Sequence, residues 1–122
     1  MILDSNIVIL AAKPEHKEML EQFRGKSFAI SVNSRVEVRG CHKLTDRDRS
    51  FFEAFFAVLE ILPITDGVLD RAIALRQARK MSLGDAIIAA TALVFGRELK
   101  THNLRDFSGI PDLLASDPLA AI

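Results

Sequence analysis

The chain has 122 residues, of which 49% are hydrophobic and 26% charged, and its 16 basic side chains balance its 16 acidic ones. This composition predicts one globular domain over residues 1–122, and it argues against a membrane span because no apolar run reaches about 18 residues. A net charge of zero is not typical of a nucleic-acid-binding protein, although local basic patches would be hidden in such a total.

Cysteine and histidine usage limits the location and the metal chemistry. Cys41 is the only cysteine, so an internal disulfide is impossible and a reducing cytoplasm is the expected location. The N-terminal residues lack the basic and long apolar segments of a signal peptide. The three histidines are scattered without zinc-ligand spacing, so we expect any bound metal to be a hard cation with oxygen ligands, such as Mg²⁺ or Mn²⁺.

The first predicted element is a short strand at Ile2–Leu3 that ends at Asp4. Ser5 and Asn6 follow, and both are good residues for starting a helix or turn. In parallel α/β sheets ligand sites form at the carboxyl ends of the strands, which would place Asp4 at such a site. A simple Asx turn or helix cap explains Asp4 equally well at this point.

A helix and a second strand follow before the next acidic residue of interest. Residues 14–24 predict an amphipathic helix, and residues 28–32 predict the strand. Asn33 or Ser34 then caps a helix that contains Glu37. The spacing from Ser34 to Glu37 also fits a capping box, which offers a structural explanation for Glu37.

Residues 44–60 predict a helix that is unusually rich in phenylalanine, with Phe51, Phe52, Phe55 and Phe56 on one side. Their apolar arc is wider than the roughly 100° stripe that packs a helix against one sheet. We expect the excess to form a partner surface, and the alternative is that all four rings lie in the core. A third strand at residues 61–64 follows, which Pro63 assigns to a sheet edge, and Asp66 caps the next helix.

The most informative stretch is residues 82–93, which predict a helix that ends near Gly96. It is apolar on almost every face, so it should be buried, yet it carries the carboxylate of Asp85. The helical neighbours of Asp85 are apolar and cannot pair with a charge, whereas a bound cation could compensate it. Capping is the competing explanation, because Ser82 and Asp85 have capping-box spacing.

The last elements are a strand at residues 98–101, a polar loop at residues 102–106 and a weak strand at residues 113–115. Strands that alternate with helices along the chain predict a parallel sheet covered on both faces. Right-handed crossovers would then bring four acidic residues to one end of the sheet. These four are Asp4, Glu37, Asp85 and Asp106.

Four neighbouring carboxylates repel one another and would not all stay ionised without a cation. One or two Mg²⁺ or Mn²⁺ ions would relieve this repulsion and would activate water for phosphodiester hydrolysis. Neutral polar side chains around the acids would orient ligands and water. We assign this role to Ser5, Asn6, Thr101 and Asn103.

Three stretches and Glu37 together resemble the PIN domain, and more narrowly the VapC-type toxins of VapBC toxin–antitoxin modules. The stretches are Leu-Asp-Ser-Asn at residues 3–6, Leu-Gly-Asp-Ala-Ile-Ile-Ala-Ala-Thr-Ala at residues 83–92, and Thr-His-Asn-Leu-Arg-Asp-Phe at residues 101–107. The resemblance implies a three-layer α/β/α fold with a parallel sheet of strand order 3-2-1-4-5. It also implies a Mg²⁺- or Mn²⁺-dependent endoribonuclease.

On this resemblance the family's acidic quartet falls on Asp4, Glu37, Asp85 and Asp106, with Asp4, Asp85 and Asp106 as metal ligands. The same resemblance implies a homodimer and a VapB-type antitoxin that inserts an arginine into the acidic pocket. Two departures from the family pattern are Ser5, where Thr is more usual, and His102, where Arg often stands.

Basic side chains near the predicted site are candidates for binding RNA, namely Arg35, Arg39 and Arg105. An ordinary solvated surface is the alternative explanation for them. A catalytically silent PIN-like scaffold or RNA-binding module is the alternative function. A phosphatase or phospho-acceptor domain fits less well, because Asp4 is followed by Ser5 and Asn6 rather than by a second acid.

Overall fold

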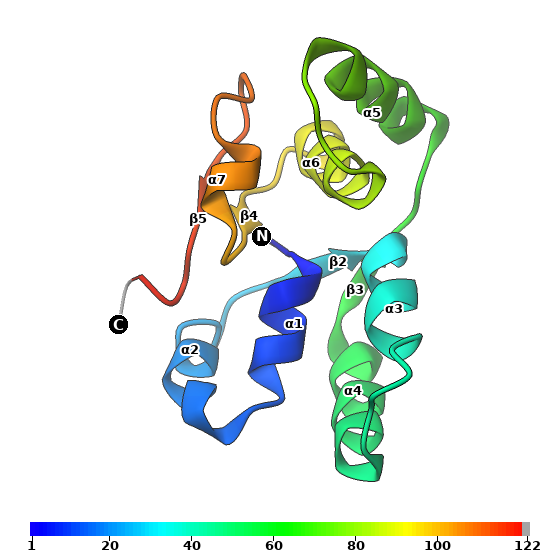
Figure 1. Cartoon of the computed structure of the whole chain (residues 1–122). Helices are drawn as coiled ribbons and strands as arrows, with labels where there is room; N and C mark the ends of the chain where they lie inside the picture. Colours follow the sequence, from blue (N-terminus) through cyan, green and yellow to red (C-terminus); the bar gives the residue numbers. More distant parts are fainter. Residues whose placement is uncertain (121–122) are drawn as a thin grey trace.

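The computed structural model describes residues 1–120, in which a five-stranded parallel sheet lies between layers of helices (Figure 1). Its strand order is β3-β2-β1-β4-β5, as the resemblance implied. The strands are β1 (Ile2–Leu3), β2 (Ala29–Ser31), β3 (Glu60–Leu62), β4 (Leu99–Lys100) and β5 (Ala115–Ser116). β1 is central, because Ile2 pairs with Ala29 of β2 on one side and with Leu99 of β4 on the other.

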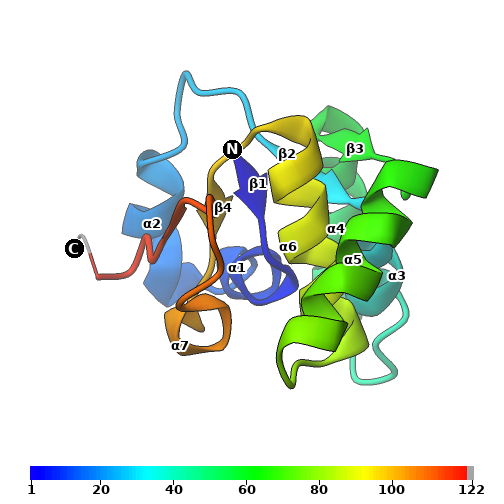
Figure 2. The same cartoon turned by 90° about the horizontal axis from the view of Figure 1, so that it is seen from above.

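The helices cover both faces of this sheet, as the view from above shows (Figure 2). They are α1 (Ser5–Ala11), α2 (Lys17–Glu21), α3 (Val32–Arg39), α4 (Asp46–Val58), α5 (Asp66–Ala78), α6 (Leu83–Phe95) and α7 (Leu104–Phe107), with a 3₁₀ turn, η1, at Pro14–His16. None of these helices is both long and apolar enough to cross a membrane.

Two hydrophobic clusters form because successive strand residues point to opposite faces of the sheet. Ile2 belongs to the cluster under α5 and α6, whereas its neighbour Leu3 belongs to the cluster under α1, α2, α3 and α4. Both residues are fully buried. The alternation along β1 therefore ties the two outer layers to the central strand.

Helix α6 forms as predicted. The Ser82 hydroxyl accepts a hydrogen bond from the backbone N–H of Asp85 at 3.1 Å and so caps the first turn. Gly96 ends the helix with a φ of 64°, a left-handed conformation that costs glycine little. Residues 86–92 are buried throughout, which explains the apolar composition on every face.

Several predicted helix boundaries are wrong, for local reasons. The predicted helix at residues 14–24 is split into η1 and α2. The cap of α3 is Ser31, whose hydroxyl accepts from the Asn33 N–H at 3.1 Å, so the strand passes directly into the helix and Asn33 and Ser34 are already helical. In the same way Thr65, not Asp66, caps α5.

The predicted partner surface of four phenylalanines is wrong for two of them. Phe52 is 2% exposed and Phe56 6% exposed, and both belong to the cluster under α1 to α4. Phe51 and Phe55 are only half-buried, and their rings stack on each other with centroids 5.5 Å apart. The helix therefore faces the core with one pair of rings, and the other pair remains at the edge of the cluster.

Candidate active site

Asp4 connects the central strand to α1, and its carboxylate is held from two sides. Oδ1 accepts from the Ser5 N–H at 2.8 Å, and Oδ2 accepts from the Thr101 hydroxyl at 2.7 Å. Asp4 is only 8% exposed and is also the N-cap of α1. Its burial raises the pKa of the carboxyl above the ordinary 3.8, the two hydrogen bonds oppose this, and the charges of Asp85 and Asp106 raise it further.

The end of β4 supplies the polar residues around Asp4. Thr101 is fully buried, and its hydroxyl also accepts from the Asn103 N–H at 3.0 Å. The His102 N–H donates to Asn6 Oδ1 at 3.3 Å. Thr101, Asn6 and the Asn103 backbone therefore fix the loop after β4 against the start of α1, where the sequence predicted neutral orienting groups.

Asp85 lies in the first turn of α6 and is partly buried. Burial raises the pKa of its carboxyl, a hydrogen bond from Ser82 lowers it, and the charge of Asp106 raises it. Ser82 caps the helix through the backbone N–H of Asp85, so this half of the predicted capping box is present. Because the net shift is upward, the carboxylate still lies where its ionised form is disfavoured.

Glu37 lies on the exposed side of α3, at the rim of the site. Asn33, one turn earlier, donates from Nδ2 to Glu37 Oε1 at 2.8 Å. A Cβ placed on Gly84 would lie 3.5 Å from the same oxygen, an ordinary van der Waals distance, so the start of α6 lies directly beside Glu37. Burial and then the charge of Asp4 raise the pKa of Glu37.

Asp106 is exposed, and it lies in the short helix α7 rather than in the predicted loop. Its N–H donates to the Asn103 carbonyl at 3.0 Å, which starts the helical turn directly after the polar residues of β4. Its charge reaches both Asp4 and Asp85. The four predicted acids thus lie near enough to one another for their charges to interact, but they come from four separate elements.

The donor set fits a hard divalent cation in its chemistry. Within residues 1–120 no three acidic, histidine or cysteine side chains form a ready-made metal-ligand group. Mg²⁺ keeps several of its waters and needs only one or two protein carboxylates, so an open arrangement of oxygens is compatible with it. The Ser5 hydroxyl is buried next to Asp4 and meets no strict hydrogen-bond geometry in the same range of residues, yet it lies close enough to Glu37 to lower the pKa of that carboxyl. It is therefore a polar group between two of the acids, where a rotating hydroxyl can orient a metal-bound water.

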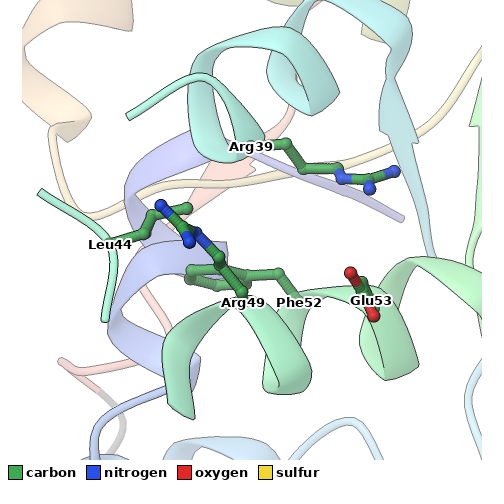
Figure 3. Close-up of a pocket in the computed structure, with 5 residues that line it drawn as sticks. All are labelled: Arg39, Leu44, Arg49, Phe52 and Glu53. Atoms are coloured by element: carbon green, nitrogen blue, oxygen red, sulfur yellow. The ribbon is translucent and has the colours of Figure 1, made fainter. Parts of the chain in front are cut away.

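The three predicted RNA-binding arginines lie in two different places. Arg105 lines a cavity together with Asp85 and Asp106. Arg35 and Arg39 are exposed along α3, and Arg39 also lines a cavity of about 120 Å³ with Arg49 and Glu53 of α4 (Figure 3). None of the four acids lines this second cavity, so only Arg105 lies directly beside the candidate site.

Sequence reasoning missed three residues around the acids. The sequence indicates only a cap role for Asn33, although its position four residues before Glu37 on a helix gives the two side chains one face. Arg79 and Lys80 line the cavity that contains Asp85 and Asp106. No motif marks them, because they reach the site through the packing of α7 against the start of α6.

Comparison with known proteins assigns the fold to a family. The PIN domain family model matches residues 1–112. No curated protein matches the sequence. Among solved structures, a toxin–antitoxin complex from Klebsiella pneumoniae is 32% identical with a TM-score of 0.78, and 96% of each chain is covered.

Two further structures have a similar fold. A DNA-bound VapBC from Salmonella typhimurium is 25% identical with a TM-score of 0.82, again over 96% of each chain. A VapBC2 from Rickettsia felis, bound to a DNA fragment from the promoter, is 23% identical with a TM-score of 0.79 over 95% of this chain and 96% of that one. The similarity extends over almost the whole chain in each case.

Proposed function

This chain belongs to the PIN domain family, and from that membership we propose that it is a nuclease toxin of a VapBC-type module that cleaves RNA with Mg²⁺ or Mn²⁺. The observation that carries the proposal is a group of four carboxylates at the carboxyl end of the sheet, namely Asp4, Glu37, Asp85 and Asp106. The charges of Asp85 and Asp106 act on Asp4, and the charges of Asp4 and Asp85 act on Glu37. Supporting it, similar chains occur in toxin–antitoxin complexes of Klebsiella and Salmonella.

In this proposal Asp4, Asp85 and Asp106 hold the cation. The bound cation would lower the pKa of a water and neutralise charge on the scissile phosphate. Thr101 fixes the orientation of the Asp4 carboxylate through its 2.7 Å hydrogen bond. Glu37, which accepts a hydrogen bond from Asn33 at the rim, would accept the proton of the attacking water, a role that its raised pKa favours.

The proposal extends to partners and location. We infer a VapB-type antitoxin, because the Salmonella and Rickettsia structures are VapBC complexes. A cationic side chain of that antitoxin would pair with the acids that remain without a metal. The half-buried rings of Phe51 and Phe55 are the remaining candidates for a partner surface, in a homodimer or with the antitoxin. The cytoplasm is the proposed site of action, where the lone Cys41 stays reduced.

The test compares cleavage of single-stranded RNA by the purified chain and by Asp85→Asn, with Mg²⁺ or Mn²⁺ and with EDTA. We expect cleavage by the wild type that EDTA stops, and at least a hundredfold slower cleavage by Asp85→Asn, because a neutral amide binds a divalent cation poorly. Asp70→Asn, an exposed acid on α5, is the matched control and should cleave normally.

A second readout is growth in bacteria that express the chain alone. Arrest by the wild type and by Asp70→Asn, but not by Asp85→Asn, supports a toxin. Undiminished cleavage by Asp85→Asn would remove Asp85 from the mechanism. A wild type that neither cleaves RNA nor arrests growth would favour the silent scaffold.

A further inference from the structure

A cavity of about 390 Å³ adjoins the candidate site. It lies between the α5–α6 connection, the first turn of α6 and helix α7, and its lining consists of Arg79, Lys80, Met81, Ser82, Asp85, Arg105, Asp106 and Ser108. Two of the candidate catalytic acids and three cations therefore share one cavity. Such a lining has an acidic part and a basic part, which is the pattern expected where a metal and a second anionic group bind side by side.

The guanidinium of Arg79 is used in hydrogen bonds within the protein. Its Nη1 donates to the Ser108 carbonyl and its Nη2 to the Gly109 carbonyl, both at 2.7 Å. Gly109 has a φ of 76°, and a Cβ there would lie 3.5 Å from Arg79 Nη2. The planar guanidinium thus binds the end of α7 to the α5–α6 connection, and this contact sets the distance between the elements that carry Asp85 and Asp106.

Lys80 and Arg105 differ from Arg79 because neither makes an ion pair within residues 1–120. Both are exposed and line the same cavity as Asp85 and Asp106. Cations that line a cavity with two acids, yet do not pair with them, remain available to an anionic ligand. During RNA cleavage the anion next to this site would be a phosphate, because every nucleotide of the strand is joined to the next by a phosphodiester.

We propose that Lys80 and Arg105 bind the phosphate adjacent to the scissile one, while Arg79 positions the wall of the cavity. The scissile phosphate then lies at the acids, and the neighbouring phosphate of the same strand lies at the two cations. The proposal rests on the proposed ribonuclease activity, because it assigns a substrate subsite to the same site. The contacts from Lys80 and Arg105 would orient the RNA strand, so their loss should affect substrate binding rather than the chemical step.

The first test measures kcat and KM for Lys80→Ala, Arg105→Ala and the double variant on a short single-stranded RNA. We expect KM to rise about fivefold for each single variant and kcat to stay within about twofold of the wild type, since each variant removes one phosphate contact. Lys17→Ala and Arg47→Ala, which remove exposed cations on α2 and α4, are the matched controls and should leave both constants unchanged.

The second test measures RNA binding alone, in an Asp85→Asn background that does not cleave. The slope of log affinity against log salt concentration should become shallower by about 0.7 for each cation removed. Equal KM and equal salt slopes in the variants and the wild type would overturn the subsite, and so would a fall in kcat with KM unchanged. A wild type that does not cleave RNA would instead refute the proposed function, so the two failures are distinguishable.

The role of Arg79 is tested by comparing Arg79→Ala with Arg79→Lys. Lysine keeps the charge but cannot donate two parallel hydrogen bonds to Ser108 and Gly109. We therefore expect both variants to lose kcat, with the fold checked by circular dichroism. Full activity of Arg79→Lys would show that the charge alone matters and would overturn the positioning role.

Discussion

Thr101→Val tests how the fold holds the Asp4 carboxylate. The substitution keeps the size and shape of the side chain and removes the hydroxyl that donates to Asp4 Oδ2 at 2.7 Å and accepts from the Asn103 N–H. Thr101 is fully buried, so water cannot replace the lost donor. A buried hydrogen bond to a charged group contributes about 1.5–3 kcal/mol to the free energy of unfolding.

This magnitude predicts two measurable effects in the metal-free protein. The melting temperature at pH 7.5 should fall by about 6–12 °C, using about 4 °C per kcal/mol for a chain of this size. The pKa of Asp4 should rise further, because the lost hydrogen bond from Thr101 favours the ionised carboxylate. The loss of stability should shrink as the pH falls through the pKa of Asp4, where the carboxyl becomes neutral in the folded state.

The control is Thr91→Val in α6. Thr91 is also fully buried and its hydroxyl donates at 2.7 Å, but to the neutral Ile87 carbonyl. Its loss should cost about 1 kcal/mol at every pH. Denaturation by urea at pH 7.5 and at a pH below the ordinary 3.8, with EDTA present, measures both variants. If Thr101→Val costs no more than Thr91→Val, or costs the same at both pH values, the bond to an ionised Asp4 does not stabilise the fold as argued.

Two further predictions concern charge and core packing. Asp85→Asn should melt at a higher temperature than the wild type in EDTA at pH 7.5, because burial and Asp106 raise the pKa of Asp85 and its ionised form therefore destabilises the fold. This difference in melting temperature should vanish as the pH falls below the ordinary 3.8. Mn²⁺ should stabilise the wild type more than the variant. If millimolar Mn²⁺ does not change the melting temperature of the wild type, the proposed metal site is contradicted. Phe52→Ser should lower the free energy of unfolding by about 3–5 kcal/mol, because the Phe52 ring is 2% exposed. Phe55→Ser should lower it less and should weaken self-association or antitoxin binding in gel filtration. Equal losses of stability in the two variants would place both rings in the core.

The sequence was most informative where one local pattern determines one element. The helix of residues 83–95 carries its own start signal in Ser82, its own stop signal in Gly96 and an apolar surface between them, so its bounds were predicted almost correctly. The strand order, by contrast, came from the resemblance to PIN domains. Strands of two or three residues contain too little pattern to specify their neighbours.

One boundary error arose where a strand and a helix meet without a loop. Ser31 both ends β2 and caps α3, whereas the sequence offers Asn33 and Ser34 as the first cap residues after the predicted strand. The missed residues have a different cause. Arg79 and Lys80 reach the cavity through contacts between segments about 29 residues apart, such as the bonds from Arg79 to Ser108 and Gly109. Such contacts leave no spacing signal in the sequence.

The structure also bears on the choice between capping and a site, which the sequence left open for Asp4. A carboxylate that serves only as a helix cap is stabilised by the helix N-terminus and its backbone hydrogen bonds, and its pKa falls. Asp4 does cap α1 and does accept the Ser5 N–H, yet burial and the charges of Asp85 and Asp106 raise its pKa overall. Capping therefore accounts for the position of Asp4 but not for its surroundings. A fold that gathers acids where their ionised forms are disfavoured loses stability at neutral pH, and a bound cation would restore it, which is why these surroundings support a metal site.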